Sequence, residues 1–232
     1  MIEPGEIISY LQMCQNENAN SLQRGMNFGS GGDHSIILMS IRKGAPYEDM
    51  VEDNGQILIY EGHDLPKNEA QYPKQNDQSL YTPKGRLTQN GRFVDAAEKY
   101  KGGAEPELIR VYEKIKDGIW VYNGVFELVD AWLKNTGERS VYKFKLHITD
   151  KTLEEKEIQK QITDLDHNRI IPSSVKLEVW KRDKGQCVSC GSKTNLHFDH
   201  ILPFSKGGTS LKAENIQLLC ARHNLQKSAK IE

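Results

Sequence analysis

The feature that most constrains the fold is one short spacing that occurs twice near the C-terminus. Cys187 and Cys190 stand three positions apart, as do Cys220 and His223, and 29 residues lie between the two pairs. Three thiolates and one imidazole are a complete ligand set for a closed tetrahedral zinc site. The sequence therefore predicts a structural Zn²⁺ held by these four side chains.

The segment around the two pairs has few other means of stability. The stretch SSVKLEVWKRD predicts a short amphipathic helix with Ser173 or Ser174 as its N-cap. GQCVSCG predicts a tight turn, NLHFDHILPF a strand, and AENIQLLCARHNLQKSAK a stretch that ends in a helix. A hairpin followed by a helix buries little apolar core, so bound metal would supply folding free energy here.

The strand predicted in this segment carries an acid and a histidine side by side. Asp199 and His200 come at the end of an apolar stretch and just before a polar turn. Neighbouring side chains on a strand point to opposite faces of the sheet. One of the two side chains is thus placed to hold a metal ion while the other handles a proton.

Composition places the chain among globular proteins. It has 232 residues, of which 37% are hydrophobic and 27% charged, enough for one large domain or two small ones. No apolar run approaches the ~18 residues of a membrane span, and the first residues, MIEPGEIISYLQ, lack a signal-peptide pattern. We therefore expect no membrane contact and a cytoplasmic protein of a prokaryotic cell. Cys14 stands alone and is expected to be a free thiol.

Charge is unevenly distributed along the chain. Residues 168–232 hold 11 Lys and Arg against 5 Asp and Glu, a net charge of +6. The preceding residues hold 20 basic and 27 acidic side chains, a net charge of −7, so the whole chain carries −1. A basic C-terminal segment favours a polyanionic partner, although a solvated basic face would have the same composition.

Residues 1–150 are predicted to form a β-rich domain with a curved sheet and short helices. SIILMSI, GQILIY, GIWVYNGVFELVDAWL and SVYKFKLHI are rich in β-branched and aromatic residues. The last of these alternates with period two, which predicts a half-buried strand. Residues 151–168 are polar with a thin apolar stripe, which favours a helical connector over a helix at a dimer contact.

The C-terminal segment resembles the zinc-stapled branch of the HNH nuclease family, whose fold is the ββα-metal unit. The resemblance is carried by CVSCG and LHFDHILPFSKGGTSLKAENIQLLCARHNLQK, with IPSSVKLEVWKRDKGQC as the usual lead-in. It implies an HNH endonuclease domain over residues 169–232. Many members have a histidine where this chain has Asn224, and cysteine is commoner at the position of His223.

This resemblance implies a role for each polar residue of the segment. His200 would be the general base that takes a proton from water. Asp199 and Asn224 would hold one catalytic Mg²⁺ or Mn²⁺, and Asn215 would position the loop so that His200 stays aimed. Lys206 and Lys227 are candidates for phosphate contacts, although solvated lysines are the default interpretation.

The first domain is similar to the SET- and RING-associated (SRA or YDG) domain. The similarity rests on APYEDMVEDNGQILIYEGHD, QNDQSL and PELIRVYEKIKDGIWVYNGVFELVDAWLKNTGERSVYKFKL. The Y-D-G signature appears as Tyr122-Asn123-Gly124, so its middle residue differs. The resemblance implies a PUA-like curved sheet that binds double-stranded DNA carrying 5-methylcytosine and flips the modified base into an aromatic pocket.

By position, Tyr47 and Tyr60 match the two rings that enclose the flipped base in that family, and ordinary sheet packing is the alternative for both. Asp49 is the nearest match to the carboxylate that contacts the base. The stretch from Tyr47 to Gly55 is one residue longer than expected, so Glu52 or Asp53 is an alternative. Glu61 replaces a small hydroxyl residue, which leaves the modification open.

The expected protein is thus an α+β chain with two domains, an SRA-like domain followed by a zinc-stapled HNH domain. Its expected activity is restriction of DNA that contains 5-methylcytosine or 5-hydroxymethylcytosine. Because one HNH site cuts one strand, a double-strand break implies a homodimer or two visits. The alternatives are a noncatalytic protein that binds modified DNA, and an HNH nuclease whose first domain recognises another mark, such as a phosphorothioate backbone or a bulkier cytosine adduct.

Overall fold

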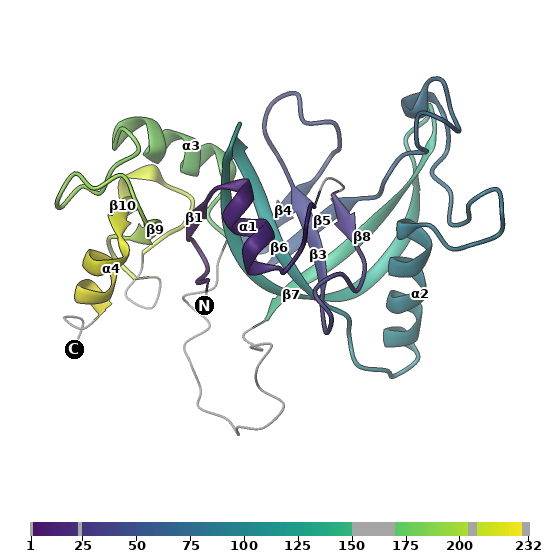
Figure 1. Ribbon diagram of the computed structural model, residues 1–232, viewed down its shortest axis with the longest axis horizontal. Helices are drawn as coiled ribbons and strands as arrows, with labels where there is room; N and C mark the ends of the chain where they lie inside the picture. The colour runs from purple at the N-terminus through teal and green to yellow at the C-terminus, as the bar shows by residue number, and fades with distance from the viewer. Residues whose placement is uncertain (1, 23–24, 150–169, 204–207, 229–232) are drawn as a thin grey trace.

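A computed structural model describes residues 2–22, 25–149, 170–203 and 208–228. We call residues 2–149 the larger unit and residues 170–228 the smaller unit; they form the right and left parts of Figure 1. The predicted connector, residues 151–168, and Lys206 lie outside the described residues.

The larger unit is built on one strongly curved sheet of eight strands (Figure 1). Its strand order is β2-β3-β6-β7-β8-β5-β4, and β1 also pairs with β7. β3 and β6 run parallel, and the other neighbours are antiparallel. The strands are β1 (Ile7–Ile8), β2 (Met26–Asn27), β3 (Ser35–Met39), β4 (Met50–Glu52), β5 (Ile57–Glu61), β6 (Leu108–Lys116), β7 (Ile119–Asn135) and β8 (Ser140–Thr149).

The larger unit also contains the helices α1 and α2, and each begins with a side-chain cap. In α1 (Tyr10–Asn16), the hydroxyl of Ser9 accepts from the backbone N–H of Gln12, whose side chain accepts in turn from Ser9 N–H. In α2 (Gln89–Lys101), Thr88 accepts from Gly91 N–H. The main apolar core lies where α2 packs against β7 and β8. Its largest fully buried rings are those of Tyr60, Phe93, Phe126 and Phe144.

The predicted strands are confirmed, and the strand SVYKFKLHI forms β8 with a partly unexpected burial pattern. Phe144, Leu146 and Ile148 are buried, as the alternation predicts. On the opposite face, Lys143 is buried too, with only 1% of its surface exposed. Its ammonium lies 2.8 Å from Glu61 Oε2 on β5, so a buried ion pair replaces the solvent-facing lysine that the sequence pattern indicates.

The smaller unit contains α3 (Ser173–Arg182), a hairpin of β9 (Leu196–His200) and β10 (Ile216–Cys220), and α4 (Ala221–Ser228). The prediction of a serine N-cap is wrong. Pro172 occupies the cap position, no side chain caps the helix, and Ser173 is already its first residue and is buried. Pro172 has a φ of −55°, which the proline ring allows, and a ψ of 144°, so its backbone is still extended at the cap.

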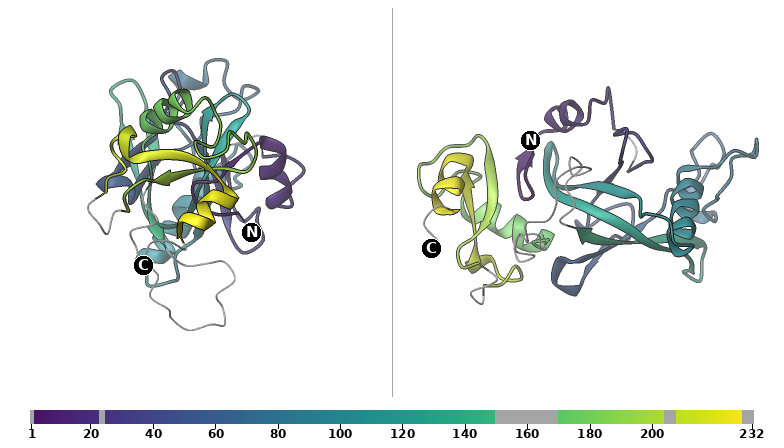
Figure 2. Two further views of the ribbon diagram at one scale, coloured as in Figure 1. Left: turned by 90° about the vertical axis from the view of Figure 1, so that its left-hand side faces the viewer. Right: turned by 90° about the horizontal axis from the view of Figure 1, so that it is seen from below.

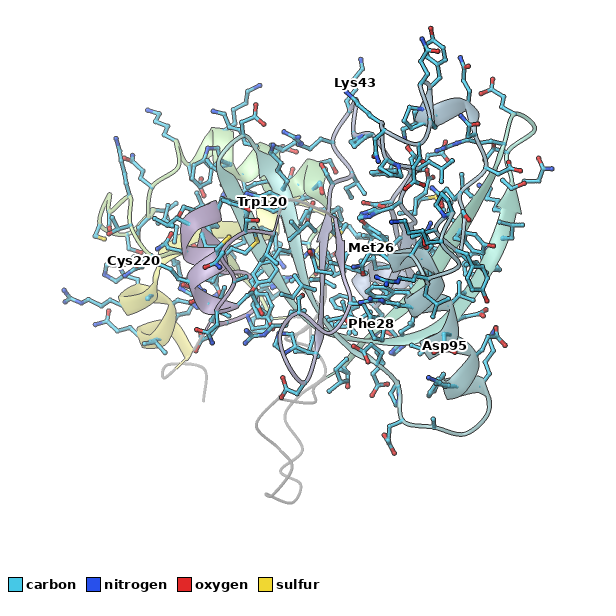
Figure 3. All side chains as sticks on the ribbon, turned by 45° about the vertical axis from the view of Figure 1, so that its right-hand side comes forward. Met26, Phe28, Lys43, Asp95, Trp120 and Cys220 are labelled. Atoms are coloured by element: carbon cyan, nitrogen blue, oxygen red, sulfur yellow. The ribbon has the colours of Figure 1, made fainter. Side chains whose placement is uncertain are left out.

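The two units together form an α+β chain in which a ββα unit follows a large sheet. In Figure 3, Met26 and Phe28 lie in the larger unit and Cys220 in the smaller one. Within the described part of the chain, no helix combines the length and apolar character needed to cross a membrane.

Candidate functional site

The four predicted zinc ligands lie together at one end of the smaller unit. Cys187 and Cys190 lie in the turn after α3, Cys220 ends β10, and His223 is on the first turn of α4. Cys190 Sγ is 3.8 Å from Cys220 Sγ, and His223 Nδ1 is 3.4 Å from Cys187 Sγ and 3.3 Å from Cys220 Sγ. All four donor atoms lie within 4.8 Å of one another.

These separations fit a tetrahedral zinc ion. Two sulfurs that each lie ~2.3 Å from one Zn²⁺ stand about 3.8 Å apart in a tetrahedron. The turn that carries Cys187 and Cys190 is closed by Cys187 N–H, which donates to Ser192 O at 2.7 Å, and Gly191 N–H, which donates to Cys187 O at 2.8 Å. The Cys₃His cluster therefore indicates a structural zinc site.

The polar surroundings favour the thiolate form that zinc requires. Burial raises the pKa of Cys187. Hydrogen bonds from the backbone N–H groups of Cys220, Ser189 and Cys190 and from His223 outweigh burial and lower the pKa to about 6. The turn is thus arranged for a negatively charged sulfur.

Asp199 and His200 end β9 and face different partners, as their alternation predicts. Asp199 is paired in the hairpin with Gln217, whose Nε2 donates to Asp199 Oδ2 at 3.1 Å. Lys227 Nζ lies 2.5 Å from the same Asp199 oxygen and also donates to the carbonyl oxygen of His200. An ammonium group thus occupies the cation-attracting position beside Asp199, where the resemblance implies a divalent metal.

His200 makes a contact that the sequence did not suggest. Its Nε2 lies 2.8 Å from the hydroxyl of Ser210, which is almost fully buried. A ring that donates from Nε2 to Ser210 Oγ presents Nδ1 as its basic nitrogen. Ser210 sits in a run of small residues, so only the fold shows its contact with the histidine.

Asn215 closes the loop that follows His200. Its Nδ2 donates to Leu202 O at 3.0 Å and to Thr209 O at 3.1 Å, while its Oδ1 accepts from Leu202 N–H at 2.8 Å. A Cβ at Gly208 would lie 1.8 Å from Leu202 O, so the loop closes this tightly only with glycine there. The part of Asn215 in aiming His200 stays a prediction, as does metal binding by Asn224 on α4.

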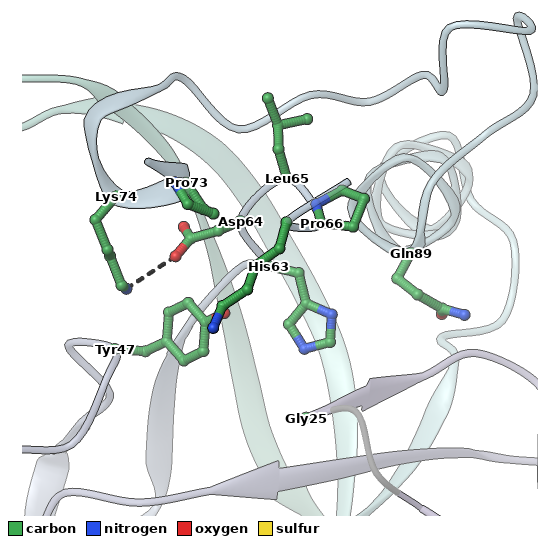
Figure 4. A pocket seen from close by; sticks show the side chains of 10 residues that line it. Gly25, Tyr47, His63, Asp64, Leu65, Pro66, Pro73, Lys74 and Gln89 are labelled. Carbon is green, nitrogen blue, oxygen red and sulfur yellow. Dashed lines mark ion pairs between the residues drawn. The ribbon is translucent and has the colours of Figure 1, made fainter. Parts of the chain in front are cut away.

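The larger unit has a pocket of about 560 Å³, shown in Figure 4. The rings of Tyr47 and His63 face each other across it, with centroids 6.1 Å apart and planes inclined by 27°. Lys74 Nζ lies 4.0 Å from the centre of the Tyr47 ring and 3.0 Å from Asp64 Oδ2. The site thus combines aromatic faces with charged groups at its rim.

Gly25 keeps this pocket open. A Cβ at this position would lie 2.4 Å from the hydroxyl of Tyr60 and 3.0 Å from His63 Nε2. His63 is held by its Nε2, which accepts from Met26 N–H at 2.9 Å. A larger residue in place of Gly25 would therefore displace both rings.

The sequence predicted Tyr47, Tyr60 and Asp49 as pocket residues; of the three, Tyr47 alone is among the residues that line the pocket described above. Tyr47 lines the pocket, whereas the Tyr60 ring belongs to the core, 1% exposed, with its hydroxyl behind Gly25. Asp49, two residues after Tyr47, is buried and accepts at 3.1 Å from both Ser40 N–H and Glu61 N–H. Burial raises its pKa to about 7, against the lowering effect of these two N–H groups and of Lys143. The alternatives Glu52 and Asp53 are exposed.

A buried charge network supports the pocket and was not predicted. Arg139, in the β7–β8 hairpin, lies 2.6 Å from Asp64 Oδ1 and 3.3 Å from Glu61 Oε1. The only sequence signal for this part of the site is the polar stretch EGHD directly after β5, which supplies Glu61, His63 and Asp64. Arg139 and Lys74 come from distant loops, so their contribution depends on tertiary structure.

Comparison with known proteins gives two family matches. The model of the SAD/SRA domain matches residues 2–151, and the model of the HNH endonuclease matches residues 187–230. Similar solved structures include a SUVH5 SRA complex with hemi-methylated CG DNA, at 25% identity and a TM-score of 0.46, over 66% of this chain and 92% of that chain. SUVH5 SRA bound to fully hydroxymethylated CG DNA has 20% identity and a TM-score of 0.43, over 62% and 85%. Arabidopsis thaliana SUVH6 has 22% identity and a TM-score of 0.42, over 66% and 27%. No curated protein matches the chain.

Proposed function

We propose a function for this chain on the ground that it belongs to the SAD/SRA domain family and carries an HNH endonuclease domain after it. The function is that of a modification-dependent DNA endonuclease. The larger unit binds a modified cytosine, 5-methylcytosine or 5-hydroxymethylcytosine, and the smaller unit hydrolyses phosphodiester bonds of the same DNA. The observation that carries the proposal is the presence in one chain of the Tyr47 pocket and of the Asp199–His200 strand end.

The pocket supports the first step. A base taken out of a duplex loses stacking worth a few kcal/mol, and an aromatic face restores part of it. Tyr47 presents such a face. Burial and, to a smaller extent, the negative charge of Asp64 raise the pKa of Tyr47, so the phenol stays protonated at neutral pH. By its position in the sequence, Asp49 remains our candidate for the carboxylate that contacts the exocyclic amino group; it lies buried beneath the residues that line the pocket, where its two oxygens accept from Ser40 N–H and Glu61 N–H.

The strand end supports the second step. His200 takes a proton from the attacking water, with its ring oriented by Ser210. Asp199 and Asn224 would hold a divalent cation such as Mg²⁺ or Mn²⁺, which when bound supplies stabilisation of charge on the scissile phosphate and the leaving oxygen. The fit is indicated by Lys227, whose ammonium already lies 2.5 Å from Asp199. Released from that carboxylate, Lys227 becomes available for a phosphate contact.

One variant of this function is favoured by a specific observation. The pocket measures about 560 Å³, and Tyr60 is set back behind Gly25 instead of closing it. Such a pocket has room for a cytosine that carries a bulkier adduct than a methyl group. The second candidate is therefore the same nuclease with a bulkier cytosine adduct as its mark. Because one HNH site cuts one strand, a double-strand break would still require a homodimer or two successive visits.

The test is a variant that separates cleavage from binding. His200→Ala is expected to lower cleavage of modified DNA by about 100-fold or more, because general-base catalysis contributes ~10²–10⁴-fold. Binding to modified DNA should stay unchanged, since the pocket lies in the other unit. His147→Ala, an exposed histidine on β8, is the matched control and should cut normally. Undiminished cleavage by His200→Ala would remove His200 from the mechanism.

A further inference from the structure

A buried ion pair joins the two units. Lys176 on α3 is 1% exposed, and its Nζ lies 2.5 Å from Glu113 Oε2 on β6 and 2.8 Å from Asn123 Oδ1 on β7. Glu113 is fully buried. The cation thus comes from the smaller unit and both of its partners from the larger one. A charge this deeply buried is stable only while its partner stays in place, so the pair resists separation of the units.

Asn123 completes the pair in a way that aspartate would not. Its Nδ2 donates to Glu113 Oε2 at 3.2 Å, while its Oδ1 accepts from Lys176. An aspartate here would lose the donor and place a second carboxylate against a single ammonium. The presence of Lys176 and Glu113 therefore accounts for Tyr122-Asn123-Gly124 in place of the Y-D-G signature.

The N-terminal segment connects the same regions through the backbone. Gly5 N–H donates to Tyr122 O at 2.8 Å, and Gly5 O accepts from Phe198 N–H at 3.1 Å. Glu6 forms a bridge with His197, and Ile7 pairs with Val121. Gly5 has a φ of +86°, and a Cβ on it would lie 3.0 Å from Phe198 O. Figure 2 shows β1 between the two units, beside the strand that carries Asp199 and His200.

Apolar packing crosses the joint as well. One buried cluster combines residues of both units: Ile115, Val121, Ile171, Val175, Val179, Phe198, Ala213, Ile216 and Leu218. The chain also enters the smaller unit against the larger one, because Ile170 N–H donates to Gly55 O at 3.2 Å. A Cβ at Gly55 would lie 2.4 Å from Ile170 O, so this approach requires glycine.

A single strand extends from the joint toward the pocket. β7 has 17 residues, begins beside Lys176 and the N-terminal segment, and ends at the hairpin that carries Arg139. Arg139 in turn pairs with Asp64, which lines the Tyr47 pocket. The pocket and the Asp199–His200 strand end are therefore linked by continuous hydrogen-bonded structure.

We infer that the two units form one rigid body, with Lys176, Glu113 and Asn123 as positioning residues that hold the HNH site at a fixed offset from the modified base. The inference rests on the proposed function for its consequence, which is cleavage at a defined number of nucleotides from the mark. Units joined only by a tether would reach many phosphates and would cut over a broad range of positions.

The experiment maps cut positions on a long duplex that carries one modified cytosine, with each strand end-labelled and resolved at single nucleotides. The wild-type protein should cut within one narrow cluster of bonds on each strand. Lys176→Met should keep its preference for binding modified DNA, widen the cluster roughly twofold or more and slow cleavage by ~10- to 100-fold, because small misplacements of reacting groups are costly. Lys181→Met, an exposed lysine on the same helix, is the control and should match the wild type.

A second variant covers failure of the first to fold. Lys176→Met with Glu113→Gln leaves no unpaired charge, retains the neutral packing and still lacks the ion pair, so it too should widen the cluster. Scattered cutting by the wild-type protein would overturn the inference. A wild-type pattern and rate in either folded variant would remove Lys176 from any positioning role.

A measurement without DNA separates this inference from the proposed function. Spin labels at Lys99→Cys on α2 and Lys193→Cys in the smaller unit report the distance between the units by electron–electron double resonance. One narrow distance population is expected, and Lys176→Met should broaden it. A broad wild-type distribution would contradict the rigid body even if modified DNA is cut. If modified DNA is not cut, the proposed function fails and the distance distribution alone decides the inference.

Discussion

The two units differ in how much of their stability they supply themselves. The larger unit closes an eight-stranded sheet over its own apolar core, which includes Phe93, Phe126 and Phe144. The smaller unit has a two-stranded sheet, and its main apolar cluster borrows Ile115 and Val121 from the larger unit. Its other cluster is built around Cys187 and Cys220.

The two units are therefore expected to depend on different sources of folding stability. A sheet with its own core folds by burying apolar surface, which is the dominant favourable contribution in domains of this size. A ββα unit of this length buries too little and needs a metal ion or a neighbour. We therefore expect the larger unit to survive changes that unfold the smaller one, and the predictions below test that asymmetry.

Removal of the metal site should have the largest effect. Cys187→Ser removes one thiolate from a Cys₃His set, and structural zinc contributes an apparent ~10–16 kcal/mol to folding of small zinc units. The variant should lose zinc and cleavage together and show an early unfolding transition in calorimetry, while the larger unit still binds modified DNA. Cys14→Ala, in the core of the larger unit, is the control and should retain zinc and cleavage. Zinc-free protein with a single wild-type transition would refute the asymmetry.

A change in the pocket should have the converse effect. Tyr47→Ala removes one stacking face, worth ~1–3 kcal/mol per base, or about 5- to 150-fold in affinity. The preference for modified over unmodified duplexes should fall by that factor in competition binding, with zinc content and unfolding unchanged. Tyr100→Ala, on the last turn of α2 and away from the pocket, should keep the preference. An unchanged preference in Tyr47→Ala would place the base elsewhere.

The smallest expected effect concerns a buried histidine that belongs to the larger unit alone. Burial lowers the pKa of His34, but its hydrogen bonds with Glu17 at 2.7 Å and Asp33 at 2.8 Å outweigh burial and raise the pKa above its usual value. A raised folded-state pKa adds stability that is complete below the unfolded pKa of about 6.5 and is lost as pH rises through the folded pKa. The free energy of unfolding should therefore decrease as pH rises above about 6.5.

Urea unfolding of the wild type and His34→Gln at several pH values measures this contribution. Above about pH 6.5, the free energy of unfolding should decrease less in the variant than in the wild type, and the difference should be roughly 1 kcal/mol or less. Glu17 acts in the other direction, because its pKa is lowered by His34, Tyr112 and Arg110 against the effect of burial, so its contribution is lost only on acidification. Identical pH dependences in the two proteins would show that the His34–Glu17 pair does not stabilise the fold.

The sequence was most informative where spacing alone defines chemistry. The Cys and His pairs place four ligands by local turns, and the alternation of β8 identifies its buried face. It was least informative where partners are far apart in the chain. The sequence gives no sign that Lys143 and Lys176 are buried, yet each pairs with a glutamate more than 60 residues away. His63 and Lys74 likewise join Tyr47 only through the loops of the folded sheet.

The most direct test of the account compares cleavage of duplexes that are identical except for cytosine, 5-methylcytosine, 5-hydroxymethylcytosine or a bulkier adduct at one position. Each duplex is incubated with the zinc-loaded protein, with Mg²⁺ or Mn²⁺ added or left out. Only modified duplexes should be cut, and only when the divalent metal is added. Equal cutting of all four duplexes would contradict the role of the pocket, and selective binding without any cutting would contradict the nuclease.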